Sequence, residues 1–119
     1  MFAEVLESIF EKVEGILGVI ILGMDGISIE KRSREEVPNL EALAAEYTSL
    51  LKGSLATTQD IGLGILEEMI VSSDTRVVLV RMVTPEYFLL AILDGNGNIG
   101  RARFELRKAK FSLEKELVI

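Results

Sequence analysis

The stretch from Asn39 to Gly62 constrains the fold most, because it has no internal proline and has helix-forming residues at most positions. At about 100° per residue, one broad side of this predicted helix is apolar: Leu40, Leu43, Ala44, Tyr47, Leu50, Leu51, Leu55, Thr58 and Ile61. The opposite side carries small residues where an ordinary surface helix carries charge: Ala42, Ala45, Ser49, Gly53 and Ala56. We therefore expect one side to cover a core and the other to let a second backbone come close, as in the recognition helix of a small dimer.

Apolar periodicity and turn residues divide the remaining chain into short elements on either side of this helix. Helical spacing predicts a first helix that begins at Phe2 and ends at Gly15. The predicted strands are 16–23, 27–32, 65–73, 75–83 and 87–93, and a terminal helix begins at Ile99. The first and last strands are apolar on both faces and belong at the centre of a sheet, whereas 27–32 is polar enough for an edge.

The composition excludes most enzyme chemistry. The chain has no histidine and no cysteine, the usual general base, thiolate nucleophile and zinc ligands. Its net charge of -6 argues against nucleic-acid binding, which depends on neutralising phosphates with Lys and Arg. We therefore predict no catalytic residue, no metal and no cofactor, and a protein that is not itself an enzyme.

Length and hydropathy indicate one globular domain over residues 1–119, with 49% hydrophobic and 27% charged residues. The longest uncharged apolar run, from Gly15 to Met24, is about half of what a membrane-spanning helix needs. The N-terminal segment is acidic and amphipathic, unlike a signal peptide. These features predict a cytoplasmic protein without membrane insertion.

A glycine-rich loop near the C-terminus matches two ligand-binding patterns. Residues 95–100 fit GxGxxG, but the chain ends before a second parallel strand could complete a dinucleotide-binding unit. The loop also matches the calcium-loop positions 1, 3, 5 and 12 with Asp94, Asn96, Asn98 and Glu105, yet Ile99 stands where that loop requires glycine. A structural strand-to-helix turn is the favoured interpretation, and a nucleotide- or metal-using protein remains the weaker alternative.

Charged and aromatic residues outside the long helix favour structural interpretations. Glu67 and Glu68 are expected to point to opposite faces of a strand as solvated charges. The basic residues of the terminal helix alternate with glutamates and predict no coherent stripe. Phe104, Phe111 and Val118 form a row that is either a docking ridge or a contact with the first helix. We favour the contact, because exposed aromatic rows are uncommon.

Three stretches together carry a family resemblance: GILGVIILGMDGISI, LEALAAEYTSLLKGSLATTQDIGLGILEEMIV and NGNIGRARFELRKA, in this order and spacing. They resemble the Roadblock dynein-light-chain family and, within it, its short prokaryotic MglB-like members. The resemblance implies an α+β fold, α-β-β-α-β-β-β-α, with a five-stranded antiparallel sheet in the order 2-1-5-4-3. It also implies that the first and last helices cover one face and the long helix the other.

The resemblance further implies a homodimer that pairs its third strands, sets its long helices side by side and binds a small Ras-like GTPase across them. We assign partner binding to the small-residue side and its polar neighbours: Ala42, Ala45, Glu46, Ser49, Gly53, Ala56, Thr57 and Asp60. The dimer interface is assigned to Ile65, Glu67, Met69, Ile70 and Val71.

The long helix contains no arginine, and Lys52 is its only cation. An arginine finger supplied to a GTPase is therefore not expected from this helix. Two alternatives stay open. The chain stimulates hydrolysis by ordering the switch segments of the GTPase without supplying a catalytic residue, or it is a non-catalytic dimeric adaptor.

Overall fold

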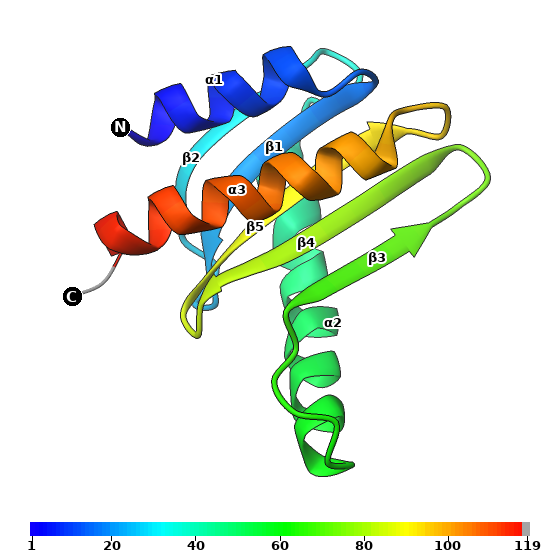
Figure 1. Ribbon diagram of the computed structural model, residues 1–119. Helices are drawn as coiled ribbons and strands as arrows, with labels where there is room; N and C mark the ends of the chain where they lie inside the picture. Colours follow the sequence, from blue (N-terminus) through cyan, green and yellow to red (C-terminus); the bar gives the residue numbers. More distant parts are fainter. Residues whose placement is uncertain (118–119) are drawn as a thin grey trace.

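A five-stranded antiparallel sheet with the strand order β2-β1-β5-β4-β3 forms the centre of the molecule (Figure 1). The computed structural model describes residues 1–117. Its elements are α1 (Phe2–Lys12), β1 (Ile16–Gly23), β2 (Ser28–Ser33), α2 (Leu40–Asp60), β3 (Glu68–Ser72), β4 (Arg76–Thr84), β5 (Tyr87–Asp94) and α3 (Ile99–Leu117). The predicted order of elements and the predicted order of strands are both confirmed.

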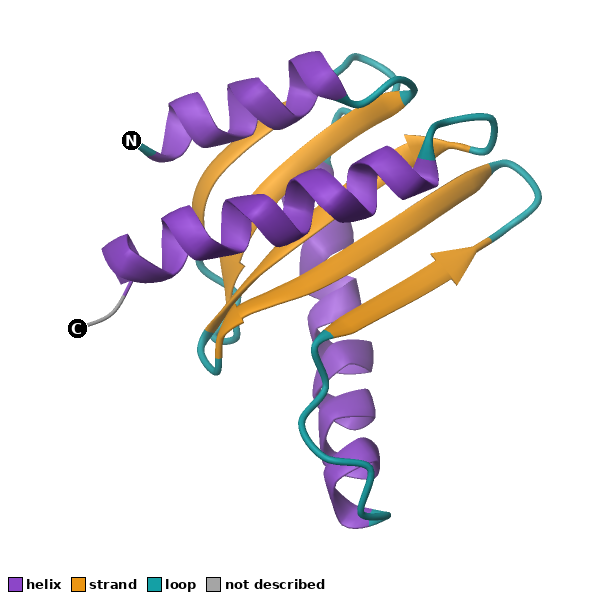
Figure 2. Cartoon of the chain, in the orientation of Figure 1, coloured by secondary structure: helices purple, strands orange, loops and turns teal. Residues whose placement is uncertain are grey.

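Helices cover both faces of the sheet. On one face α1 and α3 lie side by side, and on the other α2 crosses the strands (Figure 2). Each face has its own core: Leu6 and Leu106 belong to the first, and Leu40 and Leu51 to the second. Burial on both faces explains the apolar runs of the two central strands, in which alternate residues enter opposite cores.

The central strands pair in the register that their burial requires. Ile20 of β1 lies opposite Leu90 of β5 in the core under α2, and Ile21 lies opposite Leu89 in the core under α1 and α3. A shift of one residue would exchange these two sets of side chains, so the two cores fix the register. As predicted, β2 is a polar edge strand.

The third strand is shorter than predicted. It begins at Glu68 rather than at residue 65. The positive φ angles of Gly62 (79°) and Gly64 (97°) turn the chain at the end of α2. The connection then runs back along the projecting end of α2 before it reaches the sheet (Figure 1). The Glu67 carbonyl nevertheless accepts the backbone N–H of Met82 at 3.0 Å, so contact with β4 starts one residue before the strand.

The glycine-rich loop after β5 has the structural role predicted for it. A Cβ added at Gly15 would lie 2.5 Å from the Cα of Gly97, so the two backbones touch where α1 has ended and α3 is about to begin. The N–H of Asp94 donates to the Gly15 carbonyl at 2.8 Å, and that of Asn98 donates to the Glu14 carbonyl at 3.0 Å. The glycines permit this close approach.

Candidate partner-binding surface

The outer side of α2 carries all eight residues predicted to contact a partner, and every one is exposed. They are Ala42, Ala45, Glu46, Ser49, Gly53, Ala56, Thr57 and Asp60. A Cβ added at Gly53 would meet no atom within 4 Å. The small residues therefore do not serve packing within one protomer. We call Ala42, Ala45, Ser49, Gly53 and Ala56 the small-residue face.

The inner side of α2 is a narrow buried stripe. It consists of Leu40, Ala44, Thr48 and Leu51, which follow one another along a single line of the helix. Thr48 is the polar member, and its hydroxyl donates to the Ala44 carbonyl at 2.9 Å. Asn39 caps the helix, since its side chain accepts the N–H of Ala42.

The predicted apolar side of α2 was too broad. Leu50 is 51% exposed and Ile61 is 64% exposed, so the prediction that both belong to the core was wrong. Leu50 is exposed because it lies about 100° around the helix from Leu51, away from the buried stripe. Ile61 is exposed because the C-terminal end of α2 extends past the sheet (Figure 1), where no strand lies beneath it. Leu51 is accordingly the last buried residue of the helix.

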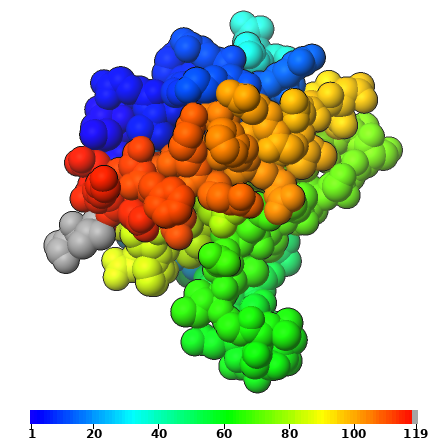
Figure 3. Space-filling view, in the orientation of Figure 1, coloured from blue at the N-terminus to red at the C-terminus, as the bar shows by residue number. Residues whose placement is uncertain are grey.

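The projecting end of α2 is closed by a defined C-terminal cap. The N–H of Leu63 donates to the Thr58 carbonyl at 3.0 Å and that of Gly62 to the Gln59 carbonyl at 3.1 Å, with Gly62 left-handed. This is the Schellman arrangement. It turns the chain back along the helix and leaves Leu63 and Ile65 exposed at the tip, which forms the projecting lobe in Figure 3. Clustered exposed apolar side chains are typical of an interaction site.

Two hollows flank this projecting region. One, of about 430 Å³, lies on α2 itself and is lined by Ser49, Leu50, Gly53, Ser54, Thr57 and Thr58. The other, of about 500 Å³, lies where α2 leaves the sheet, and Leu55, Leu66 and Met82 contribute apolar walls. Both hollows are open on the side of the molecule that carries the predicted partner-binding and dimer residues.

The residues predicted for the dimer interface lie in two settings. Met69, Ile70 and Val71 belong to β3, the edge strand, whereas Ile65 and Glu67 lie in the connection before it. The prediction that Ile65 and Glu67 are strand residues was therefore wrong. Met69 and Val71 pack partly against the core under α2, and Ile70 is exposed on the opposite face, across from Leu79.

The outer edge of β3 offers unpaired backbone groups. The backbone groups of Glu67 and Ser73 form hydrogen bonds with β4. Because hydrogen bonding alternates along an antiparallel strand, the odd-numbered residues between them also direct their backbone groups toward β4. The backbone groups of Glu68, Ile70 and Ser72 then point away from the sheet. An edge of this kind can accept another strand.

A network of ion pairs that sequence reasoning missed joins β3, β4 and α3. The Glu68 carboxylate lies 2.7 Å from Nη2 of Arg103 and 3.4 Å from Nη2 of Arg81. The hydrogen bond from Arg103 is the main reason that the pKa of Glu68 lies below its ordinary value, although partial burial opposes the shift. Glu68 is thus not the freely solvated charge that was predicted. Pairing across 13 and 35 residues leaves no local signal in the sequence.

The aromatic row on α3 does not contact α1. Phe104 and Phe111 are 53% and 58% exposed, so the favoured prediction of packing against the first helix was wrong. Val118, the third member of the row, lies outside the described residues. The face of α3 that does meet the core carries small and aliphatic residues, Ala102, Leu106, Ala109 and Leu113, which leaves the rings outside.

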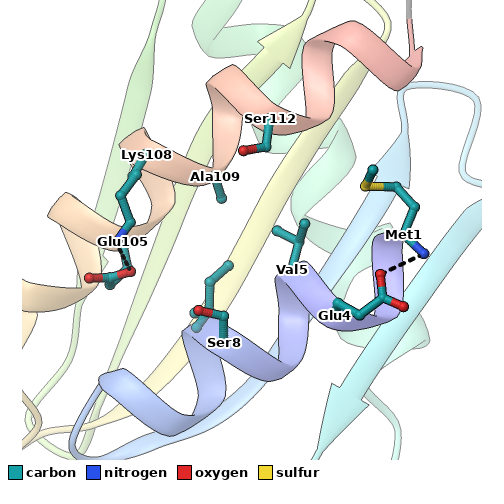
Figure 4. Close-up of a pocket in the computed structure, with 9 residues that line it drawn as sticks. Met1, Glu4, Val5, Ser8, Glu105, Lys108, Ala109 and Ser112 are labelled. Atoms are coloured by element: carbon teal, nitrogen blue, oxygen red, sulfur yellow. Dashed lines mark ion pairs between the residues drawn. The ribbon is translucent and has the colours of Figure 1, made fainter.

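The contact between α1 and α3 encloses a shallow hollow of about 240 Å³ (Figure 4). Val5, Ile9 and Ala109 are among the apolar residues that line it, and the charged residue Glu105 is buried beside them. The Glu105 carboxylate lies 3.1 Å from Arg101 and 3.2 Å from Lys108 on its own helix. The carboxylate that the calcium-loop pattern would assign to a metal ion is therefore paired with two cations of its own helix.

Within residues 1–117, no group of three or more His, Cys, Asp or Glu side chains is placed to hold a metal ion. Over the same range, no helix combines the length and the apolar character needed to cross a membrane.

Comparison with known proteins gives a consistent result for the fold. No family model matches the chain, and a search of curated proteins finds no match. Among solved structures, MglC from Myxococcus xanthus is 30% identical, with 98% of each chain covered and a TM-score of 0.73. A Roadblock/LC7 domain from Streptomyces avermitilis is 14% identical over 96% of this chain and 95% of its own, with a TM-score of 0.86.

Myxococcus xanthus MglB is 16% identical over 95% of this chain and 91% of its own, with a TM-score of 0.85. The two matches of lower identity show the shared fold, and the MglC match extends the relationship to sequence over nearly the full length of both chains. The chain belongs to the Roadblock family, as one of its MglB-like members.

Proposed function

We propose that this chain is a cytoplasmic regulatory homodimer that binds a small Ras-like GTPase. The observation that carries the proposal is the small-residue face of α2, which is fully exposed although a monomer gains nothing from such a surface. Small side chains let another backbone approach closely, and Glu46, Thr57 and Asp60 beside them supply polar groups for specificity. The resemblance to MglB and MglC proteins supports the same assignment.

Self-association is proposed through the open edge of β3 and the projecting end of α2. The outward backbone groups of Glu68, Ile70 and Ser72 suit antiparallel pairing with a second copy of the strand. The exposed side chains of Leu63 and Ile65 at the tip would lose water contact in such an assembly. Pairing two protomers in this way would bring two small-residue faces close to each other.

The proposed effect on the GTPase is positional. Since α2 has no arginine, this helix cannot supply the arginine that many activating proteins insert into the active site. A rigid helix face can instead stabilise one arrangement of the switch segments of the partner. The same lack of arginine favours a second candidate function, that of a dimeric adaptor which binds without changing hydrolysis.

The test combines complex formation with GTP hydrolysis, using small Ras-like GTPases from the source organism. We expect a stable complex on a sizing column with light scattering, and the Ala45→Trp variant should lose it because the bulky ring blocks close approach. Ala3→Trp, the same change at an exposed position of α1, is the matched control and should bind normally. Binding without faster hydrolysis would select the adaptor. Failure of every such GTPase to bind would overturn the proposal.

A further inference from the structure

A cationic pocket lies on the other side of the sheet from α2, between α3 and the first residues of β3. Its volume is about 370 Å³, and the side chains that define it are Arg81, Arg103, Arg107, Lys110, Glu68 and Phe111. Arg103, Arg107 and Lys110 fall on one side of α3 because they are spaced by four and then three residues. These three basic residues thus form a local row on the helix.

The charges of the pocket do not balance. Four cationic side chains line it together with two carboxylates, those of Glu67 and Glu68, which leaves two positive charges in excess. Glu68 is engaged by Arg103 and Arg81. Within residues 1–117, neither Arg107 nor Lys110 has a carboxylate at ion-pair distance. The excess stands out in a chain whose net charge is -6.

Arg81 supplies an independent indication that the pocket takes a ligand. This side chain is only 7% exposed, and its Nε has no hydrogen-bond partner among the described residues. A buried guanidinium N–H without an acceptor is costly, so native structures rarely retain one. An anion in the pocket would supply the missing acceptor.

An aromatic ring borders the pocket on its outer side. Phe111 lines it while remaining largely exposed, and the Nζ of Lys110 lies 5.7 Å from the centre of this ring. A molecule whose anionic group is bound between the cations would therefore also contact the ring of Phe111. Phe104, which is also exposed, lies about two turns closer to the start of α3.

We propose that this pocket binds a phosphoryl group, either as free phosphate or on a side chain of a protein partner. A phosphate dianion matches the two excess charges, and its oxygens suit the planar donors of arginine. The site lies on the face of the sheet that α2 does not occupy, so it is independent of the GTPase proposal. GTPase binding at α2 and phosphoryl binding at this pocket are therefore tested separately, although Glu68 also belongs to the strand proposed to pair in the dimer.

The first experiment titrates the intact protein with inorganic phosphate at constant ionic strength and follows the arginine Nε–Hε signals by ¹⁵N NMR. We expect saturable movement of the Arg81 signal. The variant Arg107→Gln/Lys110→Gln removes two cations of the pocket and should weaken phosphate binding about tenfold or more. Lys12→Gln/Lys115→Gln makes the same change in net charge outside the pocket and should leave the affinity unchanged.

Two results would overturn the proposal: an Arg81 signal that does not respond, or equal weakening in both double variants, which would indicate general charge screening. Far-UV circular dichroism establishes that the variants fold. A phosphoserine peptide then distinguishes the two sources. If the peptide binds more tightly than inorganic phosphate and Phe111→Ala removes this advantage, the site is assigned to a phosphorylated protein segment. Equal affinities that do not depend on Phe111 assign it to free phosphate.

Discussion

The two halves of α2 are made of similar residues but have different surroundings. Leu51 is completely buried in the core under the helix, while its neighbour Leu50 is 51% exposed. Up to Leu51 the helix lies against the sheet, and from Lys52 to Asp60 it projects beyond it (Figure 1). The first half therefore buries one side against the sheet and leaves the other side, with Leu50, exposed, whereas the second half buries no residue.

The largest expected effect separates the adjacent leucines. Leu51→Ala should lower the free energy of unfolding by about 2–5 kcal/mol, because it opens a cavity in a closed core. Leu50→Ala should lower the free energy of unfolding of the monomer by about 0.5 kcal/mol or less. Urea unfolding at protein concentrations below dimerisation measures both changes. Equal losses would mean that the buried side and the exposed side of the helix are not distinct.

The second prediction concerns the open edge beside the projecting half. Ile70→Pro removes the central outward N–H of β3, and symmetry removes it twice in a dimer paired through this strand. Two lost hydrogen bonds of about 1 kcal/mol each should raise the dimer dissociation constant about thirtyfold. Sedimentation velocity over a dilution series measures the constant. Ile70→Thr retains the N–H and should dimerise more tightly than the proline variant; an unchanged mass in Ile70→Pro would remove this interface.

A smaller effect is expected within the small-residue face itself. Gly53→Ala should raise the stability of the monomer by up to about 1 kcal/mol, since alanine favours the helix and nothing lies within 4 Å of the added methyl group. Ala56→Gly is the opposite substitution on the same face of the helix and should lower the stability of the monomer by a similar amount. Thermal unfolding of both variants provides the measurement. A loss of stability in Gly53→Ala would place a packing partner on this face.

The smallest expected effect is a pH dependence at the anchored end of β3. The folded-state pKa of Glu68 lies below its ordinary value of 4.5, chiefly because Arg103 hydrogen-bonds the carboxylate. Its stabilisation is therefore complete above about pH 4.5 and is lost as the pH falls through the lower, folded-state value. Glu68→Gln should be less stable than the parent near neutral pH, and this difference should shrink on acidification.

A double-mutant cycle with Arg103→Gln isolates this interaction. In the Arg103→Gln background, Glu68→Gln should cost less near neutral pH, and the difference between the two proteins should depend less on pH. An unchanged cost in that background would show that the ion pair does not stabilise β3.

The sequence was sufficient for the sheet but not for all of its surroundings. The range of β1 was predicted to the residue, because apolar side chains on both faces end at a glycine on each side. The start of β3 was placed three residues too early, since apolar residues such as Ile65 and Leu66 continue in the connection before the strand. Where α2 leaves the sheet is a property of the strands beneath it, so the periodicity of the helix could not show how narrow its buried stripe is.

The candidate surface on α2 was predictable because small residues at helical spacing are a local pattern, and all eight assigned residues are exposed. The cationic pocket was not predictable. Arg81 and Glu68 become neighbours through strand pairing, and α3 joins them only when it packs across β4. The aromatic row on α3 was misassigned because a general preference for buried rings was applied where smaller residues already fill the core.

The contact of Gly15 with Gly97 has a consequence for the interpretation of short motifs. A Cβ at Gly15 would collide with the backbone of Gly97, and a Cβ at Gly97 would crowd the Asp94 carbonyl oxygen at 3.0 Å, so this fold favours glycine at both positions for reasons of volume. The next loop glycine upstream of Gly97, Gly95, is also confined, because a Cβ there would lie 3.1 Å from the Thr75 carbonyl oxygen. Packing alone thus accounts for the first two glycines of the GxGxxG pattern, Gly95 and Gly97. Other chains with this fold are therefore expected to match the pattern without binding a nucleotide.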